Sequence, residues 1–149
     1  MESLLASCFY NDTNDCQSID LKSYLLELFD YLKTNENYQL VLKGNDVAFN
    51  LTIALPLGLM LNELMLNSFK HSYKDKDKGK TEIEINSTEN TLTIDYCDCS
   101  GVFPEQIDFK HSNTTGLMLI HTFAEQLKGN VNLISNSPPH YLIQIPINE

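Results

Sequence analysis

The longest periodic apolar segment of the chain covers residues 52–73, and it restricts the fold more than any other feature of the sequence. Its spacing predicts one long helix, with Pro56 in the early turns, where a missing backbone N–H is tolerated. The longest apolar run within it, residues 53–61, is well short of the roughly 18 residues that a membrane span requires. We therefore expect a buried central helix in a single domain of 149 residues.

Four polar residues interrupt the apolar stripe of this helix at helical spacing: Glu63, Asn67, Lys70 and His71. Residues three, four, seven or eight positions apart project from the same face of a helix. A carboxylate, an amide oxygen and an ammonium group aligned in this way can hold Mg²⁺ through oxygen ligands and contact phosphate oxygens. The same pattern also fits a solvated helix face, so the spacing alone leaves both interpretations open.

The segments around this helix predict alternating helices and strands. Further helices are expected at residues 18–34 and 116–127, the second of them capped by Gly129. Strands are expected at residues 38–42, 47–51, 82–86, 91–98, 130–134 and 141–147. Residues 99–115 have no periodicity and are typical of a lid or binding loop. This order predicts a two-layer α/β sandwich with helices on one face of a mixed, mostly antiparallel sheet.

The charge of the chain restricts its partners. It has 20 acidic residues and 10 lysines, no arginine, and a net charge of −10, which argues against a nucleic-acid partner. Five lysines fall within residues 70–80, so a bound phosphate would be met by lysine, backbone N–H or metal. The four cysteines lack metal-site spacing and are expected to be reduced thiols, and no signal peptide is visible. These observations predict a cytoplasmic protein.

Three segments of the sequence resemble the boxes of GHKL ATPases. Residues 55–71, LPLGLMLNELMLNSFKH, resemble the N box in the version found in bacterial sensor histidine kinases. Residues 91–104, TLTIDYCDCSGVFP, lie where that family has its Asp-Asn-Gly-x-Gly box, and residues 114–129 resemble the second glycine box and its helix. Residues 19–28 are similar to the segment that leads into this domain in the HWE-like subgroup. The resemblance covers about residues 18–147 and implies a Bergerat-type ATP-binding fold.

The resemblance implies a role for individual residues. Asn67 would bind Mg²⁺, and Glu63 would position or polarise a water molecule beside it. Asp98 would accept a hydrogen bond from the adenine amino group. Gly116 would let the backbone approach phosphate at a helix N-terminus, where anions are favoured. The full nucleotide-binding set implied is Asn67, Lys70, His71, Asp98, Gly101, Thr115, Gly116 and Leu117, although for His71 a hydrogen bond within the fold explains the residue equally well.

The glycine boxes of this chain depart from the family pattern. Ser100 and Val102 stand where two glycines are expected, Cys99 replaces the usual Asn, and Thr114 replaces the first glycine of the second box. A β-branched residue is disfavoured where φ must be positive. The loop is therefore expected either to follow a different local path or to bind nucleotide less well.

The resemblance also implies a domain organisation and an activity. Residues 1–17 are expected to be the tail of an upstream helical dimerisation hairpin, and residues 18–149 the ATP-binding catalytic domain. His71, His111, His121 and His140 lie inside or after this domain, so the histidine that accepts the ATP γ-phosphoryl group would belong to an upstream domain. The implied parent is a homodimeric sensor histidine kinase, which could be anchored in a membrane. Its partner would be the receiver domain of a response regulator. The fragment alone would not complete a catalytic turnover.

Two alternatives remain open at this stage. Stand-alone anti-sigma-factor kinases have about this length and phosphorylate serine on a partner protein. The altered loop also fits a degenerate, non-catalytic docking domain that no longer binds ATP. Nucleotide titration distinguishes this docking domain from both kinases.

Overall fold

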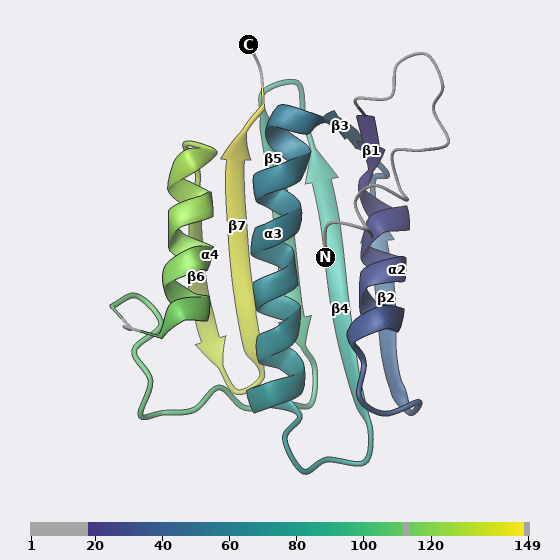
Figure 1. Cartoon of the computed structure of the whole chain (residues 1–149), viewed down its shortest axis with the longest axis vertical. Helices are drawn as coiled ribbons and strands as arrows, with labels where there is room; N and C mark the ends of the chain where they lie inside the picture. Colours follow the sequence, from purple (N-terminus) through teal and green to yellow (C-terminus); the bar gives the residue numbers. More distant parts are fainter. Residues whose placement is uncertain (1–17, 112–113, 148–149) are drawn as a thin grey trace.

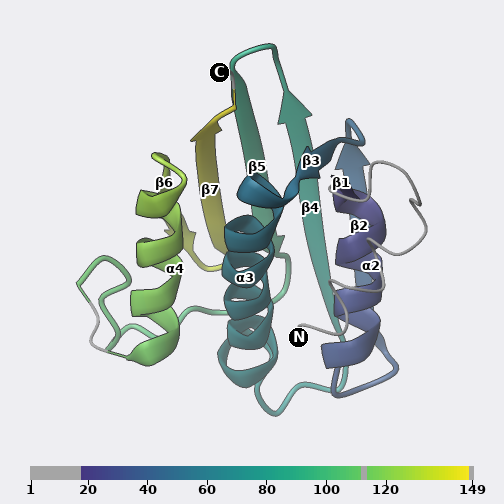
Figure 2. The same ribbon diagram turned by 45° about the horizontal axis from the view of Figure 1, so that its top comes forward.

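The computed structural model describes residues 18–111 and 114–147. Within these residues, three α-helices lie on one face of a five-stranded sheet (Figures 1 and 2). The elements in chain order are β1 (Ser18–Asp20), α2 (Leu21–Leu32), β2 (Tyr38–Gly44), β3 (Ala48–Asn50), α3 (Leu51–Asn67), the π-helical turn η1 (Ser68–Ser72), β4 (Gly79–Ser87), β5 (Thr91–Asp98), α4 (Thr115–Gln126), β6 (Asn130–Asn136) and β7 (Pro139–Pro146). The expected two-layer α/β sandwich is confirmed, whereas the prediction for residues 1–17 lies outside the described residues.

The sheet is mixed, as expected, with the strand order β2-β4-β5-β7-β6. Its only parallel pair, in the described part of the chain, joins β2 to β4, and the other pairs are antiparallel. The connection from β2 to β4 passes through β3, α3 and η1, so α3 is the crossover helix of a βαβ unit. This topology places α3 over the middle of the sheet, between α2 and α4 (Figure 2).

The short strands β1 and β3 pair with each other and fix the start of two helices. Ser18 lies opposite Asn50 in this antiparallel pair, and each strand leads directly into a helix. The Asp20 side chain accepts a hydrogen bond from the Ser23 backbone N–H, and the Asn50 side chain accepts one from the Ile53 N–H. Both are N-cap interactions, which satisfy backbone donors that the first helical turn leaves free.

The hydrophobic core fills the space between the helices and the sheet. Along β5, Leu92, Ile94, Tyr96 and Asp98 point into the core and alternate with half-buried residues on the other face. The 22-residue segment Leu51–Ser72 is long and apolar enough to span a membrane by length and composition alone. However, half of its most apolar window is buried inside the domain, where it packs as the central core helix.

Several local predictions need correction. Residues Ser18–Asp20, expected to begin the first helix, form strand β1, and β7 begins at Pro139 rather than at residue 141. The long helix is interrupted at its end, because the Tyr73 N–H donates to the Ser68 carbonyl over five residues, which is the π-helical pattern. Strand β4 begins at Gly79 rather than at residue 82. Gly129 caps α4 as expected, because its N–H donates to the Ala124 carbonyl at 2.9 Å, but the left-handed residue of the cap is Lys128, with φ 62°. Gly129 is instead required by close approach, since a Cβ there would lie 2.3 Å from the Gln144 carbonyl oxygen.

Candidate functional site

A cleft of about 440 Å³ opens between α3, the start of α4 and the loop that follows β5. Helix α3 ends and α4 begins at the same end of the domain (Figure 1). The cleft is lined by Glu63, Leu66, Asn67, Lys70, His71, Phe103, Ile107, Thr114, Thr115, Gly116, Leu117 and Leu119. Seven of the residues singled out from the sequence therefore lie together in one cavity: Glu63, Asn67, Lys70, His71, Thr115, Gly116 and Leu117.

The polar residues of α3 and η1 do share one face, as their spacing indicates. Glu63 and Asn67 are half-buried, whereas Lys70 and His71 are exposed. The Asn62 side-chain amide donates to Glu63 Oε2 at 3.4 Å, which orients the carboxylate. This wall of the cleft therefore offers a carboxylate, an amide and an ammonium group to a ligand.

The opposite wall is the N-terminus of α4. The first backbone N–H groups of a helix have no partner within the helix and attract anions. Gly116 lies so near α3 that a Cβ built on it would be 3.1 Å from Glu63 Oε1. A glycine at this position thus lets the start of α4 approach the carboxylate of the opposite wall.

The surroundings of His71 favour its neutral form. Burial and the positive charges of Lys70 and Lys74 lower the pKa of His71 below its usual value. The imidazole is therefore mostly neutral at pH 7. It can donate or accept a hydrogen bond in the cleft, whereas Lys70 supplies the positive charge.

Asp98, expected to contact the base, is fully buried and does not line the cleft. Its carboxylate accepts hydrogen bonds from Ser68 Oγ at 2.9 Å and from Thr81 Oγ1 at 2.9 Å. Burial raises the pKa of Asp98 to about 6, although hydrogen bonds from Ser72, Ser68, Thr81 and Tyr73 act in the opposite direction. Asp98 lies one hydrogen bond behind the cleft wall, because Ser68 directly follows the cleft-lining Asn67.

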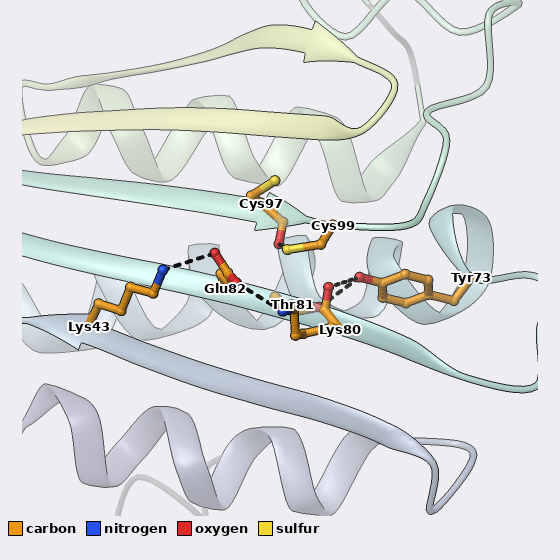
Figure 3. Close-up of polar contacts among 7 residues, drawn as sticks. All are labelled: Lys43, Tyr73, Lys80, Thr81, Glu82, Cys97 and Cys99. Atoms are coloured by element: carbon orange, nitrogen blue, oxygen red, sulfur yellow. Dashed lines mark hydrogen bonds and ion pairs between the residues drawn. The ribbon is translucent and has the colours of Figure 1, made fainter.

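A set of hydroxyl groups extends outward from Asp98. The Tyr96 hydroxyl lies 2.7 Å from Ser68 Oγ, and the Tyr73 hydroxyl donates to the Lys80 carbonyl and lies 3.3 Å from Thr81 Oγ1. Figure 3 shows Tyr73 directed at Lys80 and Thr81. We name Ser68, Ser72, Tyr73, Thr81 and Tyr96 the hydroxyl cage.

The hydroxyl cage was not among the features predicted from the sequence. A signal was present in Ser68 and Thr81, which stand at positions where the helix and strand patterns place apolar residues facing the core. A fully buried hydroxyl at such a position requires a hydrogen-bond partner. The sequence could have indicated that a partner exists, but not which residue provides it.

The loop after β5 tolerates its unusual residues without backbone strain. Among the described residues, the non-glycine residues with positive φ are Asp75 and Lys128, so Ser100 and Val102 adopt ordinary conformations. The conformational conflict anticipated at Val102 therefore does not arise. Gly101 also does not line the cleft; it packs against η1, where an added Cβ would lie 2.7 Å from Ser72 Cβ.

Aromatic packing fixes the next part of this loop. The Phe103 N–H donates to the Asn136 carbonyl at 2.9 Å, and the Phe103 ring is buried. Phe103 and Phe109 meet at a centroid distance of 6.1 Å, and both contact Tyr141 of β7. The loop is thereby anchored to the sheet beside the cleft.

The donor set fits magnesium better than a transition metal. Residues 18–111 and 114–147 contain no group of three or more His, Cys, Asp or Glu side chains that could hold a metal ion. Mg²⁺ prefers oxygen ligands and commonly binds through one or two protein groups together with substrate phosphates and water. Asn67 and Glu63 supply such oxygens in the cleft.

Cys97 and Cys99 are free thiols at the end of β5, as expected for reduced cysteines (Figure 3). Burial and the neighbouring Cys99 raise the pKa of the Cys97 thiol to about 12. Cys97 is therefore protonated at neutral pH. Cys8 and Cys16 lie outside the described residues.

The fold recurs in the catalytic domains of histidine kinases. The histidine kinase domain of a blue-light activated histidine kinase from Erythrobacter litoralis superposes with a TM-score of 0.79 and 18% identity, covering 97% of this chain and 70% of that one. Histidine kinase AdeS of Acinetobacter baumannii gives 0.68 and 20% identity, over 99% of this chain and 76% of that one. The catalytic domain of histidine kinase ThkA gives 0.67 and 14% identity, over 88% and 96% of the two chains.

These likenesses establish the class of fold. No protein-family model and no curated protein matches the sequence. At identities of 20% or below, the likeness defines the architecture and does not assign roles to residues. The chain has the α/β sandwich fold of histidine kinase catalytic domains, as the resemblance of its three boxes implies.

Proposed function

We propose that this chain is the ATP-binding catalytic domain of a sensor histidine kinase, which transfers the γ-phosphoryl group of ATP to a histidine on an upstream domain. The observation that carries the proposal is the cleft in which Glu63, Asn67 and Lys70 face the N-terminus of α4. This cleft lies in a fold shared with histidine kinase catalytic domains.

Both walls of the cleft would hold the phosphate end of the nucleotide. Lys70 and the backbone N–H groups at the start of α4 would bind the phosphate oxygens, since both present positive charge or unpaired donors. Asn67 would be a ligand of Mg²⁺, and Glu63 would orient a water molecule beside it. The bound ion supplies neutralisation of the phosphoryl oxygens. His71, which is neutral at pH 7, would contribute a hydrogen bond and no charge.

The base would be recognised at the other end of the site. Asp98 would accept a hydrogen bond from the adenine amino group, and it is one hydrogen bond away from the cleft wall through Ser68. Because the Asp98 carboxylate is fully buried, base binding would require the groups that cover it to move. Phosphoryl transfer itself would then rest on positioning and charge neutralisation.

The wider assembly follows from this role. The partners would be an upstream His-containing dimerisation domain and the receiver domain of a response regulator, within a homodimeric parent. The domain would act in the cytoplasm. The net charge of −10 is compatible with the absence of a nucleic-acid partner.

Calorimetry with ATP in the presence and absence of Mg²⁺ tests the proposal. We expect ATP to bind, with higher affinity when Mg²⁺ is present. A chain that binds neither ATP nor adenosine would contradict the proposal and favour a docking domain. In a protein that contains the upstream segment, an acid-labile phosphoryl label is expected on histidine, whereas an acid-stable label would favour a serine kinase.

A further inference from the structure

The carboxylate of Asp98 is held almost entirely by hydroxyl groups. Ser68 Oγ lies 2.9 Å from both carboxylate oxygens, and Thr81 Oγ1 lies 2.9 Å from one of them. Ser68, Thr81 and Asp98 are all fully buried. A buried carboxylate that accepts several hydrogen bonds is fixed in one orientation, because each bond lost would leave an unsatisfied group in the core.

Within residues 18–111 and 114–147, no positive charge is among the main causes that set the pKa of Asp98. The ionisable groups that interact with Asp98 from the surrounding elements are Tyr73 after η1, Tyr96 and Cys97 of β5, and Tyr141 of β7. Burial raises the pKa of each of them, so all are uncharged at neutral pH. Lys80, next to Thr81, directs its ammonium group to Glu82 at 3.2 Å (Figure 3).

Ser68 is suited to serve both protonation states of Asp98. A serine hydroxyl has one hydrogen to donate and two lone pairs that accept. When Asp98 is ionised, Ser68 donates to it and can accept from Tyr96, whose hydroxyl is 2.7 Å away. When Asp98 is protonated, Ser68 can accept from the acid and turn its own hydrogen to the Leu64 carbonyl, at 3.3 Å.

We propose that Ser68 and Thr81 are positioning residues for base recognition: their hydroxyl groups orient the Asp98 carboxylate and stabilise its ionised form, the form that accepts a hydrogen bond from an adenine amino group. The inference rests on the proposed function for its link to adenine. The hydroxyl cage replaces the cation that would otherwise be expected beside a buried carboxylate. Base binding then depends on the protonation of a group that never contacts the phosphates.

The direct test is the titration of the Asp98 carboxyl group by carbon NMR in the unliganded chain, with the signal assigned by its absence in Asp98→Asn. Removing one donor in Ser68→Ala or Thr81→Val is expected to raise the titration midpoint of Asp98 by about one pH unit. Thr93→Val is the matched control, because Thr93 is a half-buried threonine on β5, the strand that carries Asp98. Thr81→Ser keeps the hydroxyl and should titrate like the unmodified chain.

Adenosine binding supplies the second measurement. In the unmodified chain, affinity should fall as the pH is lowered through about 6, the pKa of Asp98, and the midpoint should move upward in both variants. An unchanged carboxyl titration in Ser68→Ala and Thr81→Val, both folded by circular dichroism, overturns the inference whether or not adenosine binds. Shifted titrations without adenosine binding to any chain would instead overturn the proposed function, and with it the link to base recognition.

Discussion

The end of the central helix has two sides that differ in nearly every physical respect. On the cleft side, Asn67 and Lys70 are accessible to solvent and free to meet a ligand. On the sheet side, Ser68 is fully buried and bonded to Asp98 and Tyr96. Neighbouring residues of one helical segment thus supply an open polar surface and a closed polar network.

The difference in solvent exposure predicts that the two sides of the proposed site respond differently to a ligand. Polar groups in contact with water lose little when a ligand replaces that water, so the cleft side can adapt to phosphate and Mg²⁺. A buried network must be fully satisfied at all times, so the sheet side permits few arrangements. If this comparison is correct, substitutions on the two sides will affect different parts of ATP.

The largest loss of ligand affinity is expected from a substitution on the sheet side. Asp98→Ala removes a buried acceptor for the adenine amino group, which should cost about 1–3 kcal/mol, or about 5- to 150-fold in affinity. ATP and adenosine should lose affinity equally, because the phosphates are not involved. Calorimetry with both ligands measures this, with Asn67→Ala as the control that leaves adenosine binding intact. Equal affinities in Asp98→Ala and the unmodified chain would remove Asp98 from the site.

The second effect is a pH dependence of the free energy of unfolding. The pKa of Asp98 is about 6 in the folded chain, above the ordinary 3.8, so the folded state binds more protons between these values. The free energy of unfolding should therefore fall as pH rises through this window, by about 2–3 kcal/mol from this group. Asp98→Asn removes the titration but keeps the size and hydrogen-bonding capacity of the side chain.

Urea denaturation at pH 4 and pH 7 checks this prediction. The variant should gain stability relative to the unmodified chain as the pH is raised. The lowered pKa values of Glu82 and Asp108 act in the opposite direction, but they are common to both proteins and cancel in the difference. A constant difference at the two pH values would show that Asp98 ionises as it does in the unfolded chain.

The third effect is a loss of Mg²⁺-dependent ATP binding, and it is expected from a substitution on the cleft side. Asn67→Ala should remove the Mg²⁺ dependence of ATP binding, a loss of roughly tenfold in the presence of the ion. Adenosine affinity should stay nearly unchanged, because Asn67 faces the cleft and not the hydroxyl cage. Titrations of each ligand with and without Mg²⁺ separate the two outcomes. Loss of adenosine binding as well would mean that the two sides are not independent.

The smallest effect is expected in the loop after β5. Ser100 and Val102 adopt ordinary backbone conformations and do not line the cleft, so replacing both with glycine should change ATP and adenosine affinity by less than about threefold. The double variant is measured against both ligands. A selective gain for ATP would show that these side chains obstruct the phosphate end, and would strengthen the case for a degenerate domain.

The sequence predicted the cleft side far better than the sheet side. Helical periodicity is a local property that can be read from a short segment of sequence. It therefore predicted that one helix face carries Glu63, Asn67 and Lys70. Asp98 bonds to Ser68 and Thr81, which are 30 and 17 residues away in the chain. The antiparallel register of β4 and β5 sets Thr81 opposite Asp98, and the packing of η1 on the sheet brings Ser68 to both. No local pattern encodes either arrangement.

Contacts between distant segments also explain the errors in the predicted secondary structure. The π-helical turn at Ser68–Ser72 coincides with the point where Ser68 bonds to β5, so packing on the sheet overrides the regular helix. Gly129 does cap α4 through its N–H, but its small size is needed because β7 passes close by at Gln144. In both cases a tertiary contact decides the local geometry.

The crossover that joins β2 to β4 through α3 has a consequence for how the domain opens. Because α3 connects these strands and its buried residues fill the core above them, detaching the wall that carries Asn67 and Lys70 would open the core of the domain. Backbone amides of α3 are therefore expected to exchange with deuterium only through global unfolding, and at the same rate as those of β2 and β4. ATP should then slow exchange in all three elements together, while leaving the exposed loops near their original rates.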